Sequence, residues 1–387
     1  MEEKKSKLIV EGRVFEIYDL GQPMNEAFRQ LFSSFFSSPV LNFEEFEKAT
    51  LVFFDSVEND GTLSKLQKAS SHDKFFSNFT IMWQWFWNQR RLSDAEYLWE
   101  LAVKPALDWE TKNKNCLIHK GTAFYFWGGT AILNGNLDKG YLLMHQALAE
   151  DKRKHSDPTT LPDTPSFVFV TLDYTDPRNT FKEWTLERVK FLEELLNKYQ
   201  STYSKHITSE ELRSRLLRGH RDISLIILFA YTLARFYNLE KTPPYAQESD
   251  FAGQLDTNML FDIAVIIEAL IKTKSGIRCC FKQQAKYFSD RTSLGFSDRP
   301  IDQLREVNTY FENDFDLTLR QLLDAPFRFC DSSTVSIPGG RDLAIAYGIR
   351  NHGAHNISSV PAIWERFTDL RQSLFNVLFL CIETLYP

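Results

Sequence analysis

The residues best suited to chemistry lie close together near the end of the sequence, in the run Arg350, Asn351, His352, Gly353, Ala354 and His355. Arginine carries a permanent charge, and its planar guanidinium binds two phosphate oxygens at once. Histidine changes protonation near neutral pH and can act as a general acid or base. A fixed cation beside a titratable imidazole predicts phosphodiester chemistry that needs no metal ion.

The spacing of these residues limits how they could form one site. Five residues of a straight α-helix advance by about 500°, which leaves Arg350 and His355 roughly 140° apart around the helix axis. Asn351 and His355 are four residues apart and would share a face. A complete site therefore needs either a helix distorted at Gly353 or two copies of the segment that meet.

The run resembles the Arg-x4-6-His signature of the HEPN ribonuclease superfamily, in its Arg-Asn-x-x-x-His form. The resemblance covers these six residues, and the helix-rich sequence from about residue 207 to the end agrees with it. It implies a homodimer whose two motifs line one cleft, in a metal-independent endoribonuclease. The variant with tyrosine two residues after the histidine is not matched, because Ile357 stands there.

In such a site, Arg350 would stabilise the charge that develops on the scissile phosphate. His355 would act as general base toward the ribose 2′-hydroxyl or as general acid toward the leaving oxygen, and Asn351 would orient the substrate or His355. His352 is a possible accessory residue. Single-stranded RNA is the expected substrate, since DNA lacks the 2′-hydroxyl. No cofactor and no metal are expected.

The same run also has a structural interpretation as a helix C-terminal cap, where basic residues, Asn and Gly are favoured. A helical scaffold of this kind is one alternative to catalysis. Another is a non-catalytic module whose helical bundle serves dimerisation or RNA binding, while the first part of the chain binds a protein. The position of the side chains discriminates between catalysis and binding. A shared cleft for Arg350 and His355 favours catalysis, whereas a buried ion pair away from any cleft favours binding.

The composition sets the class of protein. The 387 residues suffice for two or three domains, and 33 Phe and 8 Trp predict a core packed largely by aromatic rings. A net charge of −6 argues against a broad basic surface for nucleic acid, so contact with RNA should be local. Five scattered cysteines show no zinc spacing. The sequence shows no signal peptide and no membrane span, which predicts a cytoplasmic protein.

Hydrophobic periodicity predicts a mainly α fold in three parts. Residues 1–155 form a helical, tetratricopeptide-like region with a short β-hairpin at 8–18. Within this region we expect helices over 121–133 and 137–151, joined by a turn. Aligning Leu92 with Leu137 places Ala95 over Gly140, and small residues at such positions allow close helix approach.

Residues 156–206 are the expected linker, with a strand over 166–172 and a helix over 181–203. Residues 207–387 form the HEPN-like helical domain. Thr208 and Glu211 predict a capping box at its start. Further helices are expected over 223–237, 257–272, 301–323 and 341–350, with a flexible loop at 275–300 and a last helix after Pro361.

Other polar residues receive structural interpretations. His119 and His145 are expected to be surface or satisfied core histidines, and the run 151–155 a solvated helix end. Of the arginines between 213 and 221, some should pair with acids, while one or two could reach a phosphate. A cytosolic ribonuclease must be restrained, so residues 1–155 are expected to bind a regulatory protein or ligand. A toxin or defence effector is the implied setting.

Overall fold

The computed structural model describes most of the chain, namely residues 5–10, 12–114, 116–154, 163–203, 207–218, 222–242, 250–278, 280–292, 294, 312–324, 338–355 and 359–386. These residues are mainly α-helical with one small two-stranded sheet, which confirms the predicted mainly α fold class. The chain divides into two compact units. Unit 1 comprises Met1–Phe169 and Asp173–Lys182, and unit 2 comprises Val170–Leu172 and Glu183–Pro387.

Unit 1 begins with a β-hairpin, β1 (Lys5–Val10) and β2 (Arg13–Tyr18), paired antiparallel with Lys5 opposite Tyr18. The hairpin predicted at 8–18 is therefore confirmed, and it is longer at its start. The side-chain amide of Asn78 accepts a bond from the Tyr18 amide (2.8 Å) and donates one to its carbonyl (3.2 Å). This pair of bonds attaches the hairpin to the helices.

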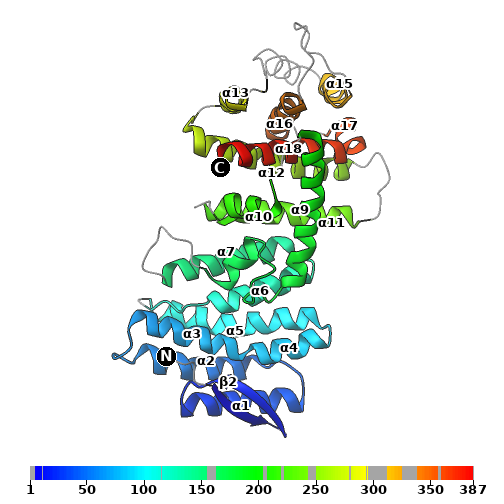
Figure 1. Cartoon of the computed structure of the whole chain (residues 1–387). Coiled ribbons are helices and arrows are strands. Elements are labelled where there is room, and N and C mark those ends of the chain that lie inside the picture. Colours follow the sequence, from blue (N-terminus) through cyan, green and yellow to red (C-terminus); the bar gives the residue numbers. More distant parts are fainter. Residues whose placement is uncertain are drawn as a thin grey trace. The chain divides into compact units, whose positions relative to one another are not determined.

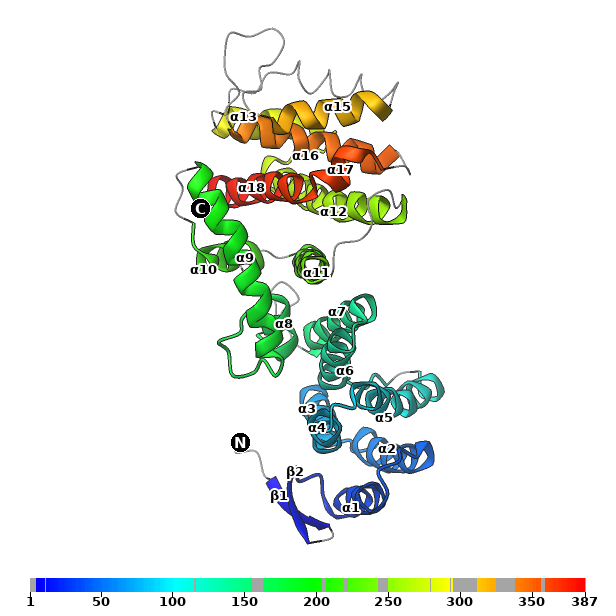
Figure 2. The ribbon, with the colours of Figure 1, turned by 90° about the vertical axis from the view of Figure 1, so that its right-hand side faces the viewer.

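The helices of unit 1 stack in a row, as Figures 1 and 2 show, with α1 on α2, α2 on α5, α5 on α6 and α6 on α7. Their bounds are α1 Gln22–Ser37, α2 Phe43–Glu58, α3 Lys65–Asn78, α4 Thr80–Asn88, α5 Leu92–Lys112, α6 Gly121–Leu133 and α7 Leu137–Lys154. Aromatic rings fill the spaces between them: Phe53 and Phe75 stack with ring centroids 4.4 Å apart. The predicted core of aromatic rings is found here, since Phe75, Phe76, Phe79, Trp83 and Phe86 are all buried.

The predicted strand over 166–172 is wrong, because residues Pro165–Val170 form the short helix α8. A short apolar run has no periodicity that separates strand from buried helix. Here Pro165 suits a first helical turn, and Ser166 donates to the Asp151 carboxylate at 2.8 Å. The residues that follow in α8 are helical and buried, and they are not part of a sheet.

Unit 2 is a bundle around α12 and α18. Figure 2 shows α16 beside this pair and α13 and α15 beyond α16, and the contacts between the elements agree. The bounds are α9 Lys182–Tyr203, α10 Ser209–Leu212, the π-helical turn η1 Arg213–Arg218, α11 Ile223–Glu240, α12 Asp250–Ser275, α13 Phe281–Thr292, α15 Glu312–Leu323, α16 Pro338–His355, α17 Pro361–Glu365 and α18 Phe367–Leu385.

Several boundaries in unit 2 differ from those predicted. The loop expected over 275–300 contains helix α13, whose Phe281 and Phe288 are buried. The last helix is two helices that meet at Arg366, and residues 301–311 of the helix expected over 301–323 lie outside the described part of the chain. Helix α9 falls within the expected linker 156–206, yet it packs in unit 2.

Among the described residues, α11 alone has the length and mean hydropathy (1.2) of a helix that could cross a membrane. A helix was predicted over 223–237, and 44% of the residues of α11 are buried. It packs against α12, and Arg235 on α11 pairs with Asp262 on α12 at 2.6 Å. The core helix of a folded bundle has the same length and composition.

Close helix contact at glycine generates a first prediction. A Cβ on Gly128 would lie 2.9 Å from the carbonyl oxygen of Gly140, so the two backbones of α6 and α7 touch there. We expect Gly128→Ala to lower the free energy of unfolding of unit 1 by about 1–3 kcal/mol, because the backbone carbonyl cannot yield. Urea unfolding followed by tryptophan fluorescence measures this, since six of the eight tryptophans lie between Trp83 and Trp127.

Gly61→Ala is the matched control, because a Cβ there meets no atom within 4 Å. Its free energy of unfolding should stay within about 0.5 kcal/mol of the wild type. Equal stability of both variants would show that α6 and α7 do not depend on this contact.

Candidate functional site

The run predicted to carry chemistry lies at the C-terminal end of α16. The helix is continuous from Pro338 through Gly353 to His355, so the distortion considered at Gly353 is absent. A Cβ on Gly353 would lie 2.7 Å from the Phe261 ring carbon Cδ2, on α12. A larger side chain at position 353 would therefore clash with α12, which explains the glycine there. With a regular helix, one copy of the motif leaves Arg350 and His355 on different faces.

Arg350 is held by an acid on the neighbouring helix. Its Nε lies 2.7 Å from Oε2 of Glu268 on α12, and its Nη2 lies 3.4 Å from Oε1. The Arg350 side chain keeps 29% of its surface exposed. One edge of the guanidinium is thus committed to a carboxylate, which fixes the direction of the other edge and offsets its charge.

The other three residues of the motif differ in their surroundings. His352 is buried, and its ring stacks on Phe315 of α15 with centroids 4.5 Å apart and 18° between planes. This position in the core of unit 2 does not suit the accessory role considered for it. Asn351 is half-buried. His355 is the last residue of α16, and its side chain lies outside the described residues.

A buried carboxylate fixes the other end of α16. Asp342 accepts a bond from the Tyr203 hydroxyl at 2.6 Å and another from the Asn376 amide at 2.9 Å. Burial raises the pKa of Asp342, while these bonds oppose the rise. Because the partners come from α9 and α18, three helices share this one polar contact. It positions the helix that carries the motif.

The arginines after the Thr208 capping box are committed to acids where they are described. Arg213 bonds Glu210 and the Leu172 carbonyl (3.0 Å), and Arg215 bonds Glu211 at 3.3 Å. The side chains of Arg218 and Arg221 lie outside the described residues. The contacts of Arg213 and Arg215 match the ion-pair interpretation of this run.

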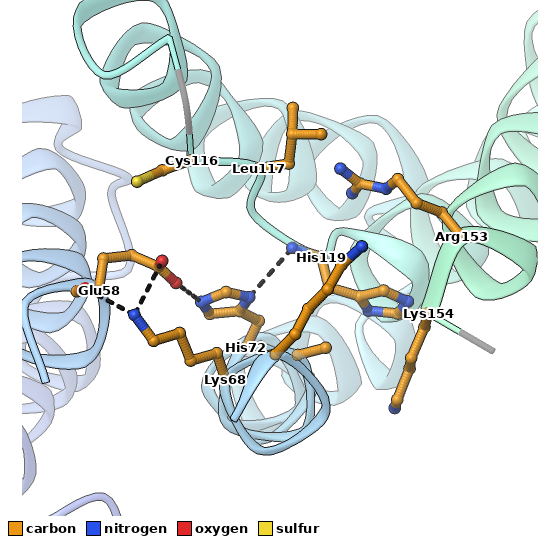
Figure 3. A pocket seen from close by; sticks show the side chains of 10 residues that line it. Glu58, Lys68, His72, Cys116, Leu117, His119, Arg153 and Lys154 are labelled. Carbon is orange, nitrogen blue, oxygen red and sulfur yellow. Dashed lines mark hydrogen bonds and ion pairs between the residues drawn. The ribbon is translucent and has the colours of Figure 1, made fainter. Parts of the chain in front are cut away.

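A second group of polar residues surrounds a cavity of about 500 Å³ in unit 1 (Figure 3). At its floor, His72 Nε2 lies 2.8 Å from Oε1 of Glu58, and Nδ1 accepts a bond from the His119 backbone amide at 3.0 Å. The accepting Nδ1 must be unprotonated, which assigns the proton to Nε2. Burial lowers the pKa of His72, so the ring is neutral.

His119 lies between two carboxylates. Its Nδ1 is 3.0 Å from Oδ1 of Asp73, and its Nε2 is 3.5 Å from Oδ1 of Asp151. Burial alone would lower the pKa of His119, but Asp151 and Asp73 raise it to about 9. Burial likewise opposes the fall in the pKa of Asp73, which His119 and Lys154 lower to about 2. At neutral pH the group is an imidazolium between two anions.

Only part of this cluster was predicted correctly. His119 was expected to be a surface or satisfied core histidine, and it is a satisfied core one; His145 is exposed. The run from Asp151 was expected to be a solvated helix end; this is wrong for Asp151, whereas Lys152, Arg153 and Lys154 keep partial exposure in the last turn of α7. Asp151 is buried beside His119, and Lys154 bonds Asp73 at 2.6 Å.

The partners in the unit 1 cluster are far apart in sequence, so no local sequence motif predicts their contacts. The nearest available signal was the spacing of Lys65, Lys68 and His72 on one side of α3. Within the described part of the chain, no group of three or more His, Cys, Asp or Glu residues is arranged to hold a metal ion.

Comparison of the chain with protein-family models, with curated proteins and with solved structures finds no match. The inferences on function therefore depend on the residues and their geometry.

The raised pKa of His119 predicts a pH-dependent stability of unit 1. The imidazolium form contributes fully below the unfolded-state pKa of 6.5, and its contribution is lost as pH rises toward about 9. The free energy of unfolding should therefore fall between pH 6.5 and 9, by up to about 3 kcal/mol. Urea titrations at several pH values, followed by tryptophan fluorescence, measure the fall.

His119→Gln should flatten this pH dependence, because glutamine has no charge to lose. His145→Gln is the control on an exposed histidine and should keep the wild-type slope. If His119→Gln and the wild type lose stability in parallel over this range, another group is responsible.

Proposed function

We propose that the chain is a metal-independent endoribonuclease that cleaves single-stranded RNA, with an active site formed when the α16 ends of two copies meet. One observation carries the proposal: Arg350 is oriented by Glu268 and still partly exposed, at the end of a continuous helix that terminates at His355. The continuous helix also favours the solution with two copies over a site within one.

The proposed reaction follows from the residue types. His355 removes the proton from the 2′-hydroxyl of ribose, and the 2′-oxygen attacks the adjacent phosphorus. The exposed edge of Arg350 stabilises the charge that builds up on the phosphate oxygens. The partner copy's His355 protonates the leaving 5′-oxygen. The products are a 2′,3′-cyclic phosphate and a 5′-hydroxyl, and Asn351 orients the substrate.

In this proposal the homodimer forms through unit 2, RNA is the substrate, and the protein works in the cytoplasm as a regulated toxin or defence effector. A free ribonuclease there would damage the cell's own RNA, so unit 1 is the part assigned to regulation. The HEPN resemblance of the motif supports this setting, together with the helical surroundings of α16.

A second function has its own supporting observations, namely the ion pair of Arg350 with Glu268 and the burial of His352. Both suit a non-catalytic helical module in which the motif only packs α16 on its neighbours. In that case Arg350→Ala and Glu268→Gln should each destabilise unit 2, and no RNA should be cut.

Cleavage of labelled single-stranded RNA in EDTA tests the proposed activity. The wild type should leave 2′,3′-cyclic phosphate ends. His355→Ala should lower the rate about 10²–10⁴-fold, because it removes the general base. Arg350→Ala should lower it about 10²–10³-fold through lost charge stabilisation. His145→Ala, on an exposed helix face, should cut like the wild type. Cutting by both wild type and His355→Ala, or by neither, refutes the assignment.

Co-expression of Arg350→Ala with His355→Ala tests the two-copy site separately. Each mixed dimer keeps one intact Arg350 and one intact His355, so it should regain part of the activity that both single variants lack. The measurement is made at a concentration where mixed dimers are confirmed by mass. If the mixture is as inactive as its components, Arg350 and His355 act within one copy of the chain.

A further inference from the structure

The cavity in unit 1 is lined by more cations than anions. The stripe Lys65, Lys68 and His72 follows the spacing i, i+3 and i+7 along α3 and forms one wall. Arg153 and Lys154, in the last turn of α7, also line it, and the segment with Cys116 and Leu117 completes it (Figure 3). We propose that this cavity binds a small phosphorylated molecule through Lys65, Lys68 and Arg153.

Glu58 is the one acid among the described residues that line the cavity, and its charge is already offset. Glu58 places Oε1 2.8 Å from His72 Nε2 and Oε2 3.5 Å from Lys68 Nζ, and its side chain is only 8% exposed. Figure 3 shows Glu58, Lys68 and His72 linked along one side of the cavity. Because Glu58 is directed toward these partners, it presents little negative charge to an entering anion.

The three proposed anchors keep donors for a ligand. Lys65 is exposed and has no partner within the described residues. Lys68 donates to the Glu58 carbonyl at 2.6 Å, and an ammonium has two further protons. Arg153 uses Nη2 for the Ile118 carbonyl (3.1 Å) and for Glu150, which leaves the other guanidinium nitrogens. Lys154, in contrast, is committed to Asp73.

The position of Lys65 at the amino end of α3 is electrostatically unfavourable without an anion, whereas Lys68 is partly offset by Glu58. Lys65 and Lys68 stand in the first two turns of α3, whose amino end carries partial positive charge, and no acidic residue occupies the first turn. Arg153 adds a third cation to the same cavity. A phosphate group would interact favourably with all three side chains and with the helix dipole at once.

The size and lining of the cavity restrict the ligand. About 500 Å³ lies within the roughly 300–1,000 Å³ typical of small-molecule sites. Ala69 and Leu117 supply apolar surface, and the described lining holds no Phe, Tyr or Trp ring on which a base could stack; the imidazoles of His72 and His119 are buried. Recognition should therefore depend on the phosphate groups, and a diphosphate offers two of them to cations that stand on separate helices, α3 and α7.

Isothermal titration calorimetry of the full chain with inorganic pyrophosphate, at low ionic strength and in EDTA, tests the site. We expect saturable binding with one site per chain. Lys65→Glu and Arg153→Ala should each weaken the affinity at least 10-fold. Lys74→Glu on α3 and Lys152→Ala on α7 are matched controls with the same charge changes on residues that do not line the cavity, and they should bind like the wild type.

Circular dichroism and urea unfolding establish that each variant is folded. Because Lys65 is exposed, Lys65→Glu is the variant expected to disturb the fold least. Absence of binding by the wild type, or equal weakening in the controls, overturns the proposal. The proposal is also overturned if pyrophosphate does not bind and single-stranded RNA binds in a way that depends on Lys65. None of these readouts uses RNA cleavage, so the result is independent of the proposed ribonuclease activity.

Discussion

The distance between helix backbones at glycine is the constraint on which the charged sites of this protein depend. A Cβ on Gly121 would lie 2.6 Å from Asp151 and 2.7 Å from the His119 ring, so only glycine lets this imidazole reach its carboxylate. Gly128 against the Gly140 carbonyl holds α6 on α7, which carries Asp151 and Arg153. Gly353 brings α16 against α12, which carries the acid that holds Arg350. The His119–Asp151 and Arg350–Glu268 ion pairs thus each depend on a glycine at their own packing contact.

Charge inside the protein is arranged in two different ways. In unit 1 the imidazolium of His119 has a carboxylate at each nitrogen, and its own side chain is only 4% exposed, with Asp151 at 12% and Asp73 at 25%. Breaking such a group by removing one partner costs much more than losing a surface ion pair. In unit 2 the Arg350–Glu268 pair is partly exposed, so its attraction is weaker and a competing phosphate can share the guanidinium. The first arrangement suits a scaffold, and the second suits exchange of partners.

Local signals allowed much of the fold to be predicted from the sequence. The helix over 121–133 was placed correctly because Asn134-Gly135 ends it, with Gly135 at φ 91°. The capping box was also correct, since the Thr208 hydroxyl accepts from the Glu211 amide at 3.1 Å. Residues 166–172 were misassigned because their burial depends on tertiary contacts. The contacts of His72 and His119 could not be foreseen, since their acidic partners lie on other helices. The motif at 350–355 was found by spacing, but its partner Glu268 lies 82 residues away.

The path of the chain between the two units has a consequence for how they can be inherited. Residues Val170–Leu172 belong to unit 2, although the chain on both sides of them, up to Phe169 and from Asp173 to Lys182, belongs to unit 1. The Leu172 carbonyl accepts from Arg213 at 3.0 Å, which ties this tripeptide to unit 2. A single recombination point anywhere in this stretch would leave one unit short of its own residues. The two units are therefore expected to be exchanged between genomes together rather than as separate modules.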